Sequence, residues 1–428
     1  MRASAPAVDF LLVFTSRRIA AVLLLGFASG LPLALTAGTL QAWLAVEGVD
    51  IKTIGLFTLV GQPYTYKFLW APLMDRYTLP FLGRRRGWLI VTQFALLAAI
   101  ALMGTVNPRE SPWLLAIVAL AVAFLSASQD IVFDAYRTDV LRDAERGPGA
   151  ATSVLGYRIA MLVSGGGALV LADQFLGWSA MYFLMAALMG VGIITTWFAP
   201  EPEQPARAPE SLASAISEPL REFFSRHGAW LLLLLIVLYK LGDAFAGSLT
   251  TAFLIQGVGF SATDVGAINK ALGLIATIVG ALLGGAWMIQ LGLYRALMLF
   301  GALKAITNLG FMLVAVVGKN YLVMVAAVAA ENVCGGMGTA AFVALLMALC
   351  DRRYSATQYA LLSALAAVGR VYVGPVSGVL VSAAGWASFF LFTFVIALPG
   401  LALLWYMRAQ LSDERLARSD SDQPPLPK

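Results

Sequence analysis

The stretch Glu201-Pro-Glu-Gln-Pro-Ala-Arg-Ala-Pro209, which continues through Ser211 to Arg226, is the only long polar connection in this sequence of 428 residues. On each side of it lie six apolar stretches of about 20 residues, the length that a helix needs to cross a bilayer. The composition, with 60% hydrophobic and 12% charged residues and a mean hydropathy of +0.81, excludes a soluble globular domain. The sequence therefore predicts an all-α integral membrane protein of twelve transmembrane helices, the second of them at residues 54–73.

Four parts are predicted along the chain. They are an N-terminal six-helix bundle at 1–199, a cytoplasmic linker at 200–228, a C-terminal six-helix bundle at 229–410 and a polar cytoplasmic tail at 411–428. In the linker, Leu212, Ile216, Leu220 and Phe223 recur at helical spacing, which indicates an amphipathic helix on the membrane face. A flexible tether that contains a short helix explains this pattern equally well.

Basic residues are sorted between alternate connections. One set of connections, together with both termini, contains 20 of the 29 lysines and arginines, whereas the opposite set contains only Lys52, Arg109 and Lys319. Because short loops rich in lysine and arginine stay in the cytoplasm, both termini are predicted to be cytoplasmic. The other basic residues lie inside apolar stretches, at Lys67, Arg158, Lys240, Lys270, Lys304 and Arg370.

The two halves of the sequence resemble each other at a nearly constant offset of 208 to 212 residues. The matched positions are Trp43 with Phe253, Gly55 with Gly266, Arg158 with Arg370, and Trp178 with Trp386. An offset held across most of a half predicts a duplicated six-helix unit. Arg158 and Arg370 are then expected to face each other across a central pathway.

A basic motif lies between the second and third predicted spans and reads Asp75-Arg76 followed by Gly83-Arg84-Arg85-Arg86. This motif and the six-plus-six arrangement resemble those of the major facilitator superfamily, in which the aspartate pairs with arginine and braces the cytoplasm-closed state. The resemblance implies a major facilitator fold. It also implies that Asp75, Arg76, Arg84 and Arg85 form a gating motif.

Ionisable side chains inside the apolar stretches call for a functional explanation, because a charge at mid-bilayer costs about 2.5–3.5 kcal/mol on insertion scales. Asp130 and Asp134 are four residues apart and share one helix face. Two carboxylates that face an apolar interior disfavour joint ionisation, so one of them can carry a proton. We predict Asp130 as the proton carrier of a coupled transporter, with Asp134 and nearby lysines tuning it and Glu331 as the alternative. A structural pairing of Asp134 with Arg137 or Arg158 is the competing explanation for that residue.

The buried bases either counter these acids or line a cavity for an anionic solute. Arg158 and Arg370 suit carboxylates, because a guanidinium makes two parallel hydrogen bonds. Lys240 and Asp243 are three residues apart and can neutralise each other, whereas Lys304 has no evident partner and is set aside as a side chain that snorkels. The predicted substrate-binding residues combine bases with neighbouring polar and aromatic side chains: Arg158, Arg370, Lys67, Lys240, Lys270, Gln129, Gln41, Trp43, Tyr64, Tyr239, Asp243, Phe245 and Tyr372.

Metal sites and catalytic motifs are not recognisable in the sequence. Cys334 and Cys350 lack metal-ligand spacing, and His227 is the single histidine. The chain is therefore predicted not to be an enzyme, and to use no cofactor other than the proton as a coupling ion.

Several stretches resemble the AmpG-type muropeptide permeases of the bacterial inner membrane. They are Gly26-Phe-Ala-Ser-Gly-Leu-Pro-Leu-Ala-Leu-Thr36, Lys67-Phe-Leu-Trp-Ala-Pro-Leu-Met-Asp-Arg76, Ser126-Ala-Ser-Gln-Asp-Ile-Val-Phe-Asp134, Tyr239-Lys-Leu-Gly-Asp-Ala-Phe-Ala246 and Glu331-Asn-Val-Cys-Gly-Gly-Met-Gly338. The resemblance implies proton-driven import of N-acetylglucosaminyl-anhydromuramyl peptides into the cytoplasm, for cell-wall recycling and β-lactamase induction. It implies a monomer in the inner membrane whose partners are the bilayer, the muropeptide and protons, with no nucleic acid.

Other functions share much of this pattern. A superfamily transporter of another organic anion or a drug has the same composition, and only the family stretches speak against it. An integral membrane enzyme and an uncoupled uniporter are the remaining alternatives. The buried acids argue against the uniporter, and the lack of a histidine-based site argues against the enzyme.

Overall fold

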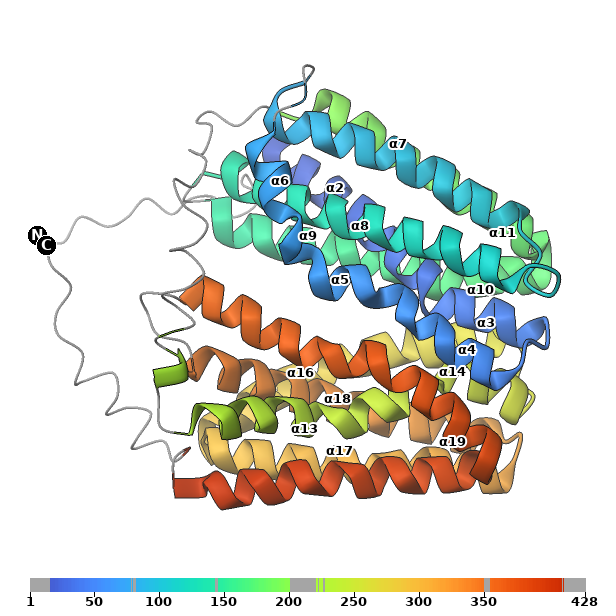
Figure 1. Ribbon diagram of the computed structural model, residues 1–428, viewed down its shortest axis with the longest axis vertical. Coiled ribbons are helices and arrows are strands. Elements are labelled where there is room, and N and C mark those ends of the chain that lie inside the picture. The colour runs from blue at the N-terminus through green and yellow to red at the C-terminus, as the bar shows by residue number, and fades with distance from the viewer. Residues whose placement is uncertain are drawn as a thin grey trace, which may run out of the picture. The chain divides into compact units, whose positions relative to one another are not determined.

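The computed structural model describes residues 16–77, 79, 82–142, 145–200, 221, 223–225, 228–349, 355–409 and 411. Within these residues the regular secondary structure is helical, and no strand occurs (Figure 1). The chain forms two compact units. The first comprises the described parts of Met1–Val49, Val60–Pro209 and Ser261–Gly266, and the second those of Asp50–Leu59, Glu210–Phe260 and Ala267–Lys428.

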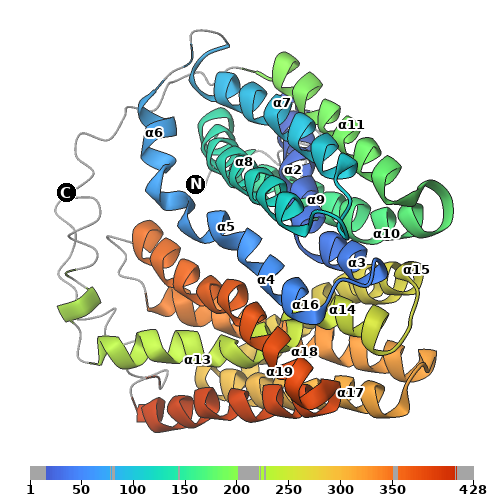
Figure 2. The ribbon, with the colours of Figure 1, turned by 45° about the vertical axis from the view of Figure 1, so that its right-hand side comes forward.

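The helices of the first half of the sequence follow one another with short connections. They are α2 (Arg17–Thr36), α3 (Gly38–Val46), α4 (Ile51–Phe57), η1 (Thr58–Gly61), α5 (Gln62–Tyr66), η2 (Lys67–Leu69), α6 (Ala71–Arg76), α7 (Arg84–Thr105), α8 (Pro112–Val140), α9 (Arg146–Met161), η4 (Leu162–Gly167), α10 (Ala168–Leu171), η5 (Ala172–Leu176) and α11 (Gly177–Phe198). Within the first unit, α7 packs along α11 and α2 packs along α9 (Figures 1 and 2).

The helices of the second half have longer uninterrupted runs. They are α13 (Ala229–Ser248), α14 (Thr250–Ala252), η6 (Phe253–Gly257), α15 (Ala262–Asp264), η7 (Val265–Leu272), α16 (Gly273–Leu291), α17 (Leu293–Val317), α18 (Tyr321–Ala348), α19 (Ser355–Tyr406) and η8 (Met407–Ala409). Gly385 has a φ of 76° and divides α19 into two helices. The elements η4, η5, η6 and η7 are π-helical.

In the described part of the chain, nine helical segments are long and apolar enough to cross a membrane. Two of them, at 152–198 and 362–409, are long enough for two crossings each, and Gly177 and Gly385 with positive φ interrupt them. The predicted second span is not among the nine, because it is divided into short helical pieces. Prolines occupy the first turns of α5 and α6, which favours new helix starts there. The chain is therefore a multi-pass membrane protein, and the count of twelve spans stays a prediction.

Each unit includes one short segment from the other half of the sequence. Asp50 caps α4 by accepting from the backbone N–H groups of Lys52 and Thr53, each at 3.0 Å. Ser261, 211 residues later, caps α15 by accepting from the backbone N–H of Asp264 at 3.0 Å. The Thr53 hydroxyl holds the pKa of Asp50 below its usual value, so this cap is charged at neutral pH.

Matched aromatic pairs confirm the internal repeat. In the first unit the rings of Trp43 and Trp178 are stacked with centroids 6.0 Å apart. In the second unit the rings at the corresponding positions, Phe253 and Trp386, also meet, with centroids 5.1 Å apart. Positions that were matched from sequence alone therefore make the same contact in both units.

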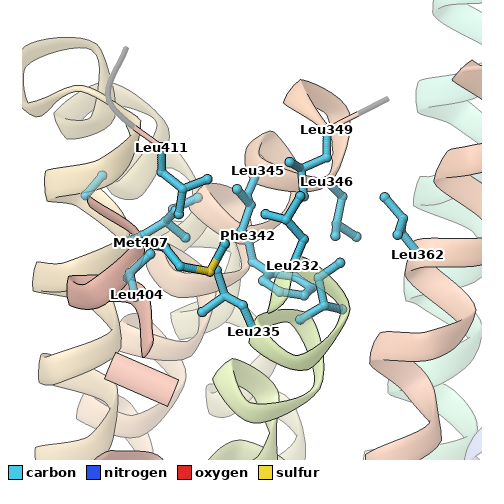
Figure 3. Packing of buried hydrophobic residues seen from close by; sticks show 14 of the residues in the cluster. Leu232, Leu235, Phe342, Leu345, Leu346, Leu349, Leu362, Leu404, Met407 and Leu411 are labelled. Carbon is cyan, nitrogen blue, oxygen red and sulfur yellow. The ribbon is translucent and has the colours of Figure 1, made fainter. Parts of the chain in front are cut away.

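Glycines bring the helices into close contact within each unit. A Cβ on Gly30 would lie 2.6 Å from the carbonyl oxygen of Tyr157, so α2 and α9 touch through their backbones. In the second unit, a Cβ on Gly280 of α16 would overlap the carbonyl oxygen of Val333 on α18. Small residues at such crossings are a common feature of membrane helix pairs. The second unit also has an apolar core, to which α13, α18 and the end of α19 contribute Leu235, Phe342 and Leu404 (Figure 3).

We expect Gly280→Ala to destabilise the protein and Gly285→Ala, on the same helix, to leave it unchanged or slightly more stable. At Gly285 an added Cβ meets nothing within 4 Å, whereas at Gly280 it displaces a backbone carbonyl. Overpacking of this kind costs about 1–3 kcal/mol. The measurement is the Tm of each purified variant in detergent. Equal Tm values for the two variants would contradict the tight α16–α18 contact.

Candidate functional site

The half-buried acid Asp130 is held in the first unit by contacts from two other segments. It lies on α8, and the Ser29 hydroxyl of α2 donates a hydrogen bond to its Oδ1. The charges of Lys67 on η2 and of Asp134, one turn further along α8, also act on Asp130. Helix α2 packs against α8 at this point. Asp130, Asp134 and Lys67 are thus near enough to one another to interact electrostatically, and their role in proton coupling stays a prediction.

Unpartnered polar atoms belong to the same segments as this acid. Ser126 Oγ, Gln129 Oε1 and the Tyr64 hydroxyl are buried and make no well-aligned hydrogen bond within the described residues, although the Tyr64 hydroxyl lies beside the side chains of Ser126 and Thr36. Gln129 is only 1% exposed. The Tyr64 hydroxyl lies close enough to Asp130 for the two groups to interact electrostatically. Since leaving a buried polar group unpaired costs about 1–3 kcal/mol, these side chains favour a ligand that supplies hydrogen bonds. Ser126 was not predicted as a site residue, although it is one helical turn from both Gln129 and Asp130.

Asp134 makes the local ion pair that was considered as its structural role. Its Oδ1 lies 3.1 Å from Arg137 Nη2, and the Asp134 side chain is 54% exposed. Arg137 also donates a hydrogen bond of 2.9 Å to the Ser153 hydroxyl on α9. Asp130 and Asp134 thus differ in environment, and Asp130 is the more enclosed of the two.

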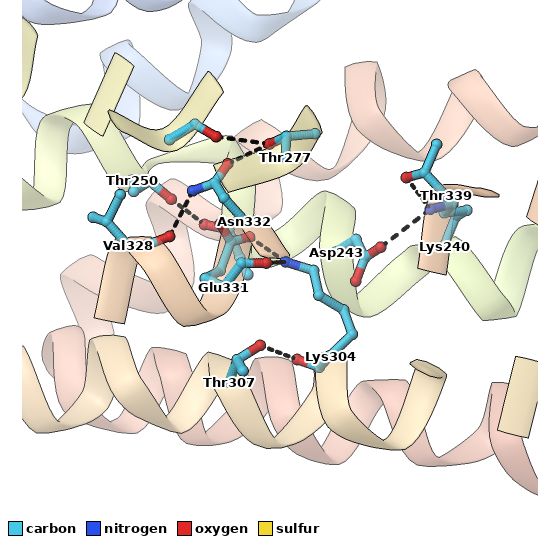
Figure 4. A network of polar contacts seen from close by, with 12 residues as sticks. Lys240, Asp243, Thr250, Thr277, Lys304, Thr307, Val328, Glu331, Asn332 and Thr339 are labelled. Atoms are coloured by element: carbon cyan, nitrogen blue, oxygen red, sulfur yellow. Dashed lines mark hydrogen bonds and ion pairs between the residues drawn. The ribbon is translucent and has the colours of Figure 1, made fainter. Parts of the chain in front are cut away.

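The second unit contains two lysine–carboxylate pairs (Figure 4). Lys240 Nζ on α13 lies 3.3 Å from Asp243 Oδ2 and 3.4 Å from the Thr339 hydroxyl on α18. Lys304 Nζ on α17 is ion-paired with Glu331 Oε1 on α18. The interpretation of Lys304 as a side chain without a partner that snorkels is therefore wrong. The pair joins neighbouring helices, so no local spacing in the sequence indicates it.

A pocket adjoins these pairs inside the second unit. It is small, with room for no more than about one water molecule, and Tyr239, Asp243 and Lys304 line it. The Tyr239 hydroxyl donates to the Leu297 carbonyl oxygen at 3.0 Å, and its ring stacks on Phe342. Tyr239 is therefore fixed in place at the pocket wall.

Three predicted basic residues make no ion pair within the described part of the chain. Lys270, in the π-helix η7, donates a 2.9 Å hydrogen bond to the Thr251 hydroxyl and meets no carboxylate there. Arg158 on α9 and Arg370 on α19 are exposed. A cation without a counter-charge within an apolar helix raises the free energy of the protein in the membrane unless water or an anion reaches it. This arrangement is consistent with anion binding.

The other predicted site residues differ in exposure. Trp43 is 3% exposed and packs on Trp178 and Tyr182, the placement of a core aromatic side chain. Phe245 is buried edge-on against Phe392. Gln41 is half-buried and Tyr372 is exposed. Among the described residues, no group of His, Cys, Asp and Glu side chains could hold a metal ion.

Contacts at equivalent positions of the repeat recur within each of the two units. Ser29 contacts Asp130 in the first unit, and Lys240, 211 residues after Ser29, contacts Thr339, 209 residues after Asp130. The contact between α2 and α8 in the first unit thus involves an acid, and the equivalent contact between α13 and α18 in the second unit involves a base.

Comparison with known proteins identifies the family. The sequence matches the Major Facilitator Superfamily over residues 22–374 and 237–427. It is 61% identical over 408 residues to the "Anhydromuropeptide permease" of Escherichia coli (strain K12), covering 95% of this chain and 83% of the relative. The chain belongs to the AmpG-type permeases of the major facilitator superfamily. It is also 34% identical to the "Putative transporter AmpG 4" of Rickettsia felis, covering 94% of this chain and 99% of the relative.

A solved structure shares the fold of this AmpG-type chain. The nucleoside transporter NupG has a TM-score of 0.71 at 13% identity, with 91% of this chain and 99% of that chain covered. At this identity the likeness concerns the fold alone. The predicted superfamily fold and the predicted family are both confirmed by these comparisons.

The basic motif of the superfamily has a partner that the sequence analysis missed. Arg85 Nε donates to Asp139 Oδ2 at 2.9 Å, which ties the start of α7 to the last turn of α8. The side chains of Asp75, Arg76 and Arg84 lie outside the part that the structure describes, so their predicted gating role stays a prediction.

Proposed function

We propose that this protein is a secondary transporter, not an enzyme, that imports anhydromuropeptides from periplasm to cytoplasm across the bacterial inner membrane. Its substrates are N-acetylglucosaminyl-anhydromuramyl peptides, and protons are the coupling ion. The observation that carries the proposal is the 61% identity to a permease of that name, spread over 95% of the chain. Such import would feed cell-wall recycling and deliver the signal for β-lactamase induction.

Asp130 is the proton carrier in this proposal. Its carboxylate is enclosed by α2 and α8 and accepts the Ser29 hydroxyl, and the charge of Lys67 acts on it from η2. Movement of Lys67 relative to Asp130 between the two facing states would change how strongly the carboxyl holds its proton. Asp134, paired with Arg137, contributes like charge one turn away.

The substrate is recognised by two kinds of group. The unpartnered atoms of Ser126, Gln129 and Tyr64 suit the amides and hydroxyls of an amino-sugar peptide, because they supply both hydrogen-bond donors and an acceptor. Lys270 and the two exposed arginines suit its carboxylates.

Uptake by the purified protein in proteoliposomes tests this function. With an inward proton gradient, labelled anhydromuropeptide is expected to accumulate above its external concentration, and a protonophore is expected to reduce it to equilibration. Unlabelled anhydromuropeptide should compete for uptake, whereas unrelated organic anions and drugs should not. If unrelated anions or drugs inhibit the accumulation of labelled anhydromuropeptide and unlabelled anhydromuropeptide does not, the substrate is another solute. Equilibration without accumulation would identify a uniporter.

A further inference from the structure

Lys304 of α17 lies between two carboxylates of the second unit. It is ion-paired with Glu331 of α18, and its charge also interacts with that of Asp243 on α13. Lys240, also on α13, contacts the same Asp243 (Figure 4). These residues form a four-charge cluster of two lysines and two carboxylates, whose net charge is zero when all four groups are ionised.

The pocket of the second unit connects Lys304 with Asp243. Both residues line it, and Gly301 and Gly338 contribute no side chain to its walls. The space inside the pocket is no larger than about one water molecule, so a change of partner by Lys304 requires its stem to re-orient along the pocket wall. Lysine has a long, flexible stem, which suits such a movement.

The two pairs in the cluster are held to different degrees. Lys304 and Glu331 are in close contact, and their side chains are 8% and 19% exposed. Lys240 lies 3.3 Å from Asp243 and 3.4 Å from Thr339, both longer than the 2.7–2.9 Å or so of a strong charge-assisted hydrogen bond. The side chain of Asp243 is also the more exposed of the two carboxylates, at 27%, so its contact with Lys240 is the one that an incoming lysine can replace.

Few other titratable groups face this cluster. Tyr239 of α13 lines the pocket, and the Cys334 side chain on α18 lies near Lys304. Helix α16, which packs on α18, has no charged residue and contributes Thr277 to Asn332 nearby. Helix α19 contributes apolar Ala397 and Leu401 to the pocket.

We propose that Lys304 exchanges Glu331 for Asp243 when Glu331 takes up a proton, and that this exchange releases Lys240 to bind an anionic group of the solute. The step breaks the Lys304–Glu331 ion pair and places the proton on the Glu331 carboxylate. It forms a Lys304–Asp243 pair and leaves the Lys240 ammonium unpaired. The inference rests on the proposed function and deepens it, because it adds to Asp130 a second proton-accepting carboxylate, Glu331, which couples proton and solute within the second unit.

Charge balance in a low-dielectric environment makes this coupling favourable. A proton alone would give the four-charge cluster a net charge of +1, and a solute carboxylate alone would give it −1. Either uncompensated charge is costly to bury. When both bind, the net charge returns to zero, so each raises the affinity for the other, as reciprocal coupling requires.

Thermal unfolding of the purified full chain in detergent tests the exchange without any substrate. In a double-mutant cycle of Lys304→Gln with Glu331→Gln at neutral pH, the change in Tm of the double variant should differ strongly from the sum of the changes of the two single variants. In the Glu331→Gln background, which mimics the protonated acid, coupling between Lys304→Gln and Asp243→Asn should appear. No Lys304–Asp243 coupling in that background, at neutral or acidic pH, would overturn the exchange.

A variant with the two charges exchanged distinguishes a role of the Lys304–Glu331 pair in proton coupling from a purely structural role. Lys304→Glu with Glu331→Lys restores an ion pair and should restore the Tm, but position 304 could then no longer donate a cation to Asp243. In proteoliposomes we expect this double variant to lose proton-driven accumulation of anhydromuropeptide. Accumulation by this double variant at the level of the parent would show that the Lys304–Glu331 pair is structural and would contradict the proposal. Glu47→Gln, which breaks the pair with the exposed Arg109 in the first unit, is the matched control and should accumulate like the parent.

The two proposals fail in different ways. If the parent protein accumulates no anhydromuropeptide, the substrate assignment fails, while the unfolding cycles still decide whether Lys304 changes partner. If the parent accumulates anhydromuropeptide and the cycles show no coupling to Asp243, the exchange fails and the transport function stands.

Discussion

Asp130→Asn is expected to abolish proton-driven accumulation of anhydromuropeptide while leaving exchange of substrate across the membrane largely intact. The asparagine side chain has nearly the same shape, and its carbonyl oxygen can still accept from the Ser29 hydroxyl that holds Asp130 now. It can no longer take up or release a proton, so the conformational cycle loses its coupling ion. An intramembrane acid of this kind is a common element of proton relays in transporters.

Two uptake measurements check this expectation in proteoliposomes. The first follows accumulation under an imposed proton gradient, which should fall to equilibration. The second follows exchange between internal and external substrate without a gradient, which should persist and become insensitive to pH. Glu47→Gln, which removes a half-buried carboxylate from its pair with the exposed Arg109, controls for the loss of one acid. Accumulation at the parent level would remove Asp130 from the mechanism, and loss of exchange as well would reassign it as a substrate ligand.

Asp134→Asn distinguishes the two acids of α8. Because Asp134 is more exposed and already pairs with Arg137, its loss should reduce accumulation only partly. If Asp134→Asn abolished accumulation and Asp130→Asn did not, the two assignments would be reversed.

Local spacing predicted those parts of the site that lie on one helix. Asp130 and Asp134 are one turn apart on α8, and Lys240 contacts Asp243 on α13, as their separations of four and three residues indicated. The repeat was also readable, because Trp43–Trp178 and Phe253–Trp386 occupy matched positions and make matched contacts. In each case the information is carried by helix geometry or by the duplication itself.

Contacts between helices were not predictable in the same way. Ser29 and Asp130 are 101 residues apart, and Lys304 and Glu331 are 27 residues apart. Which face of one helix meets another depends on close backbone approach, such as that of Gly280 on Val333, and hydropathy does not encode it. One further prediction was available from the repeat. Lys240 occupies the position that corresponds to Ser29, so it was expected to contact the helix equivalent to α8, which is α18.

The Trp43 prediction illustrates a second limit. An aromatic residue beside intramembrane charges suits either a sugar face or a core, and sequence alone does not separate the two. The structure places Trp43 against Trp178 and Tyr182, where its burial supports the packing of the first unit. Tyr239, on the other hand, does line a pocket.

Arg158→Lys and Arg370→Lys are each expected to raise the KM for anhydromuropeptide about tenfold or more, with little change in the maximal rate. Both guanidiniums are exposed on their own units and make no ion pair with a described residue, so their donors are available to a solute. Lysine keeps the charge but loses the planar pair of N–H donors that matches a carboxylate. A hydrogen bond to a charged group contributes about 1.5–3 kcal/mol, and 1.4 kcal/mol corresponds to a factor of about ten in affinity.

Initial uptake rates over a range of substrate concentrations give KM and the maximal rate separately. Arg295→Lys is the matched control, because Arg295 is an exposed arginine at the start of α17, in a predicted cytoplasmic connection, and it should leave both parameters unchanged. Substrate with amidated carboxylates adds a second test. If the arginines bind those carboxylates, amidation raises the KM of the parent but has little further effect on the KM of the lysine variants. An equal effect of amidation on the parent and on both variants would show that the arginines act elsewhere.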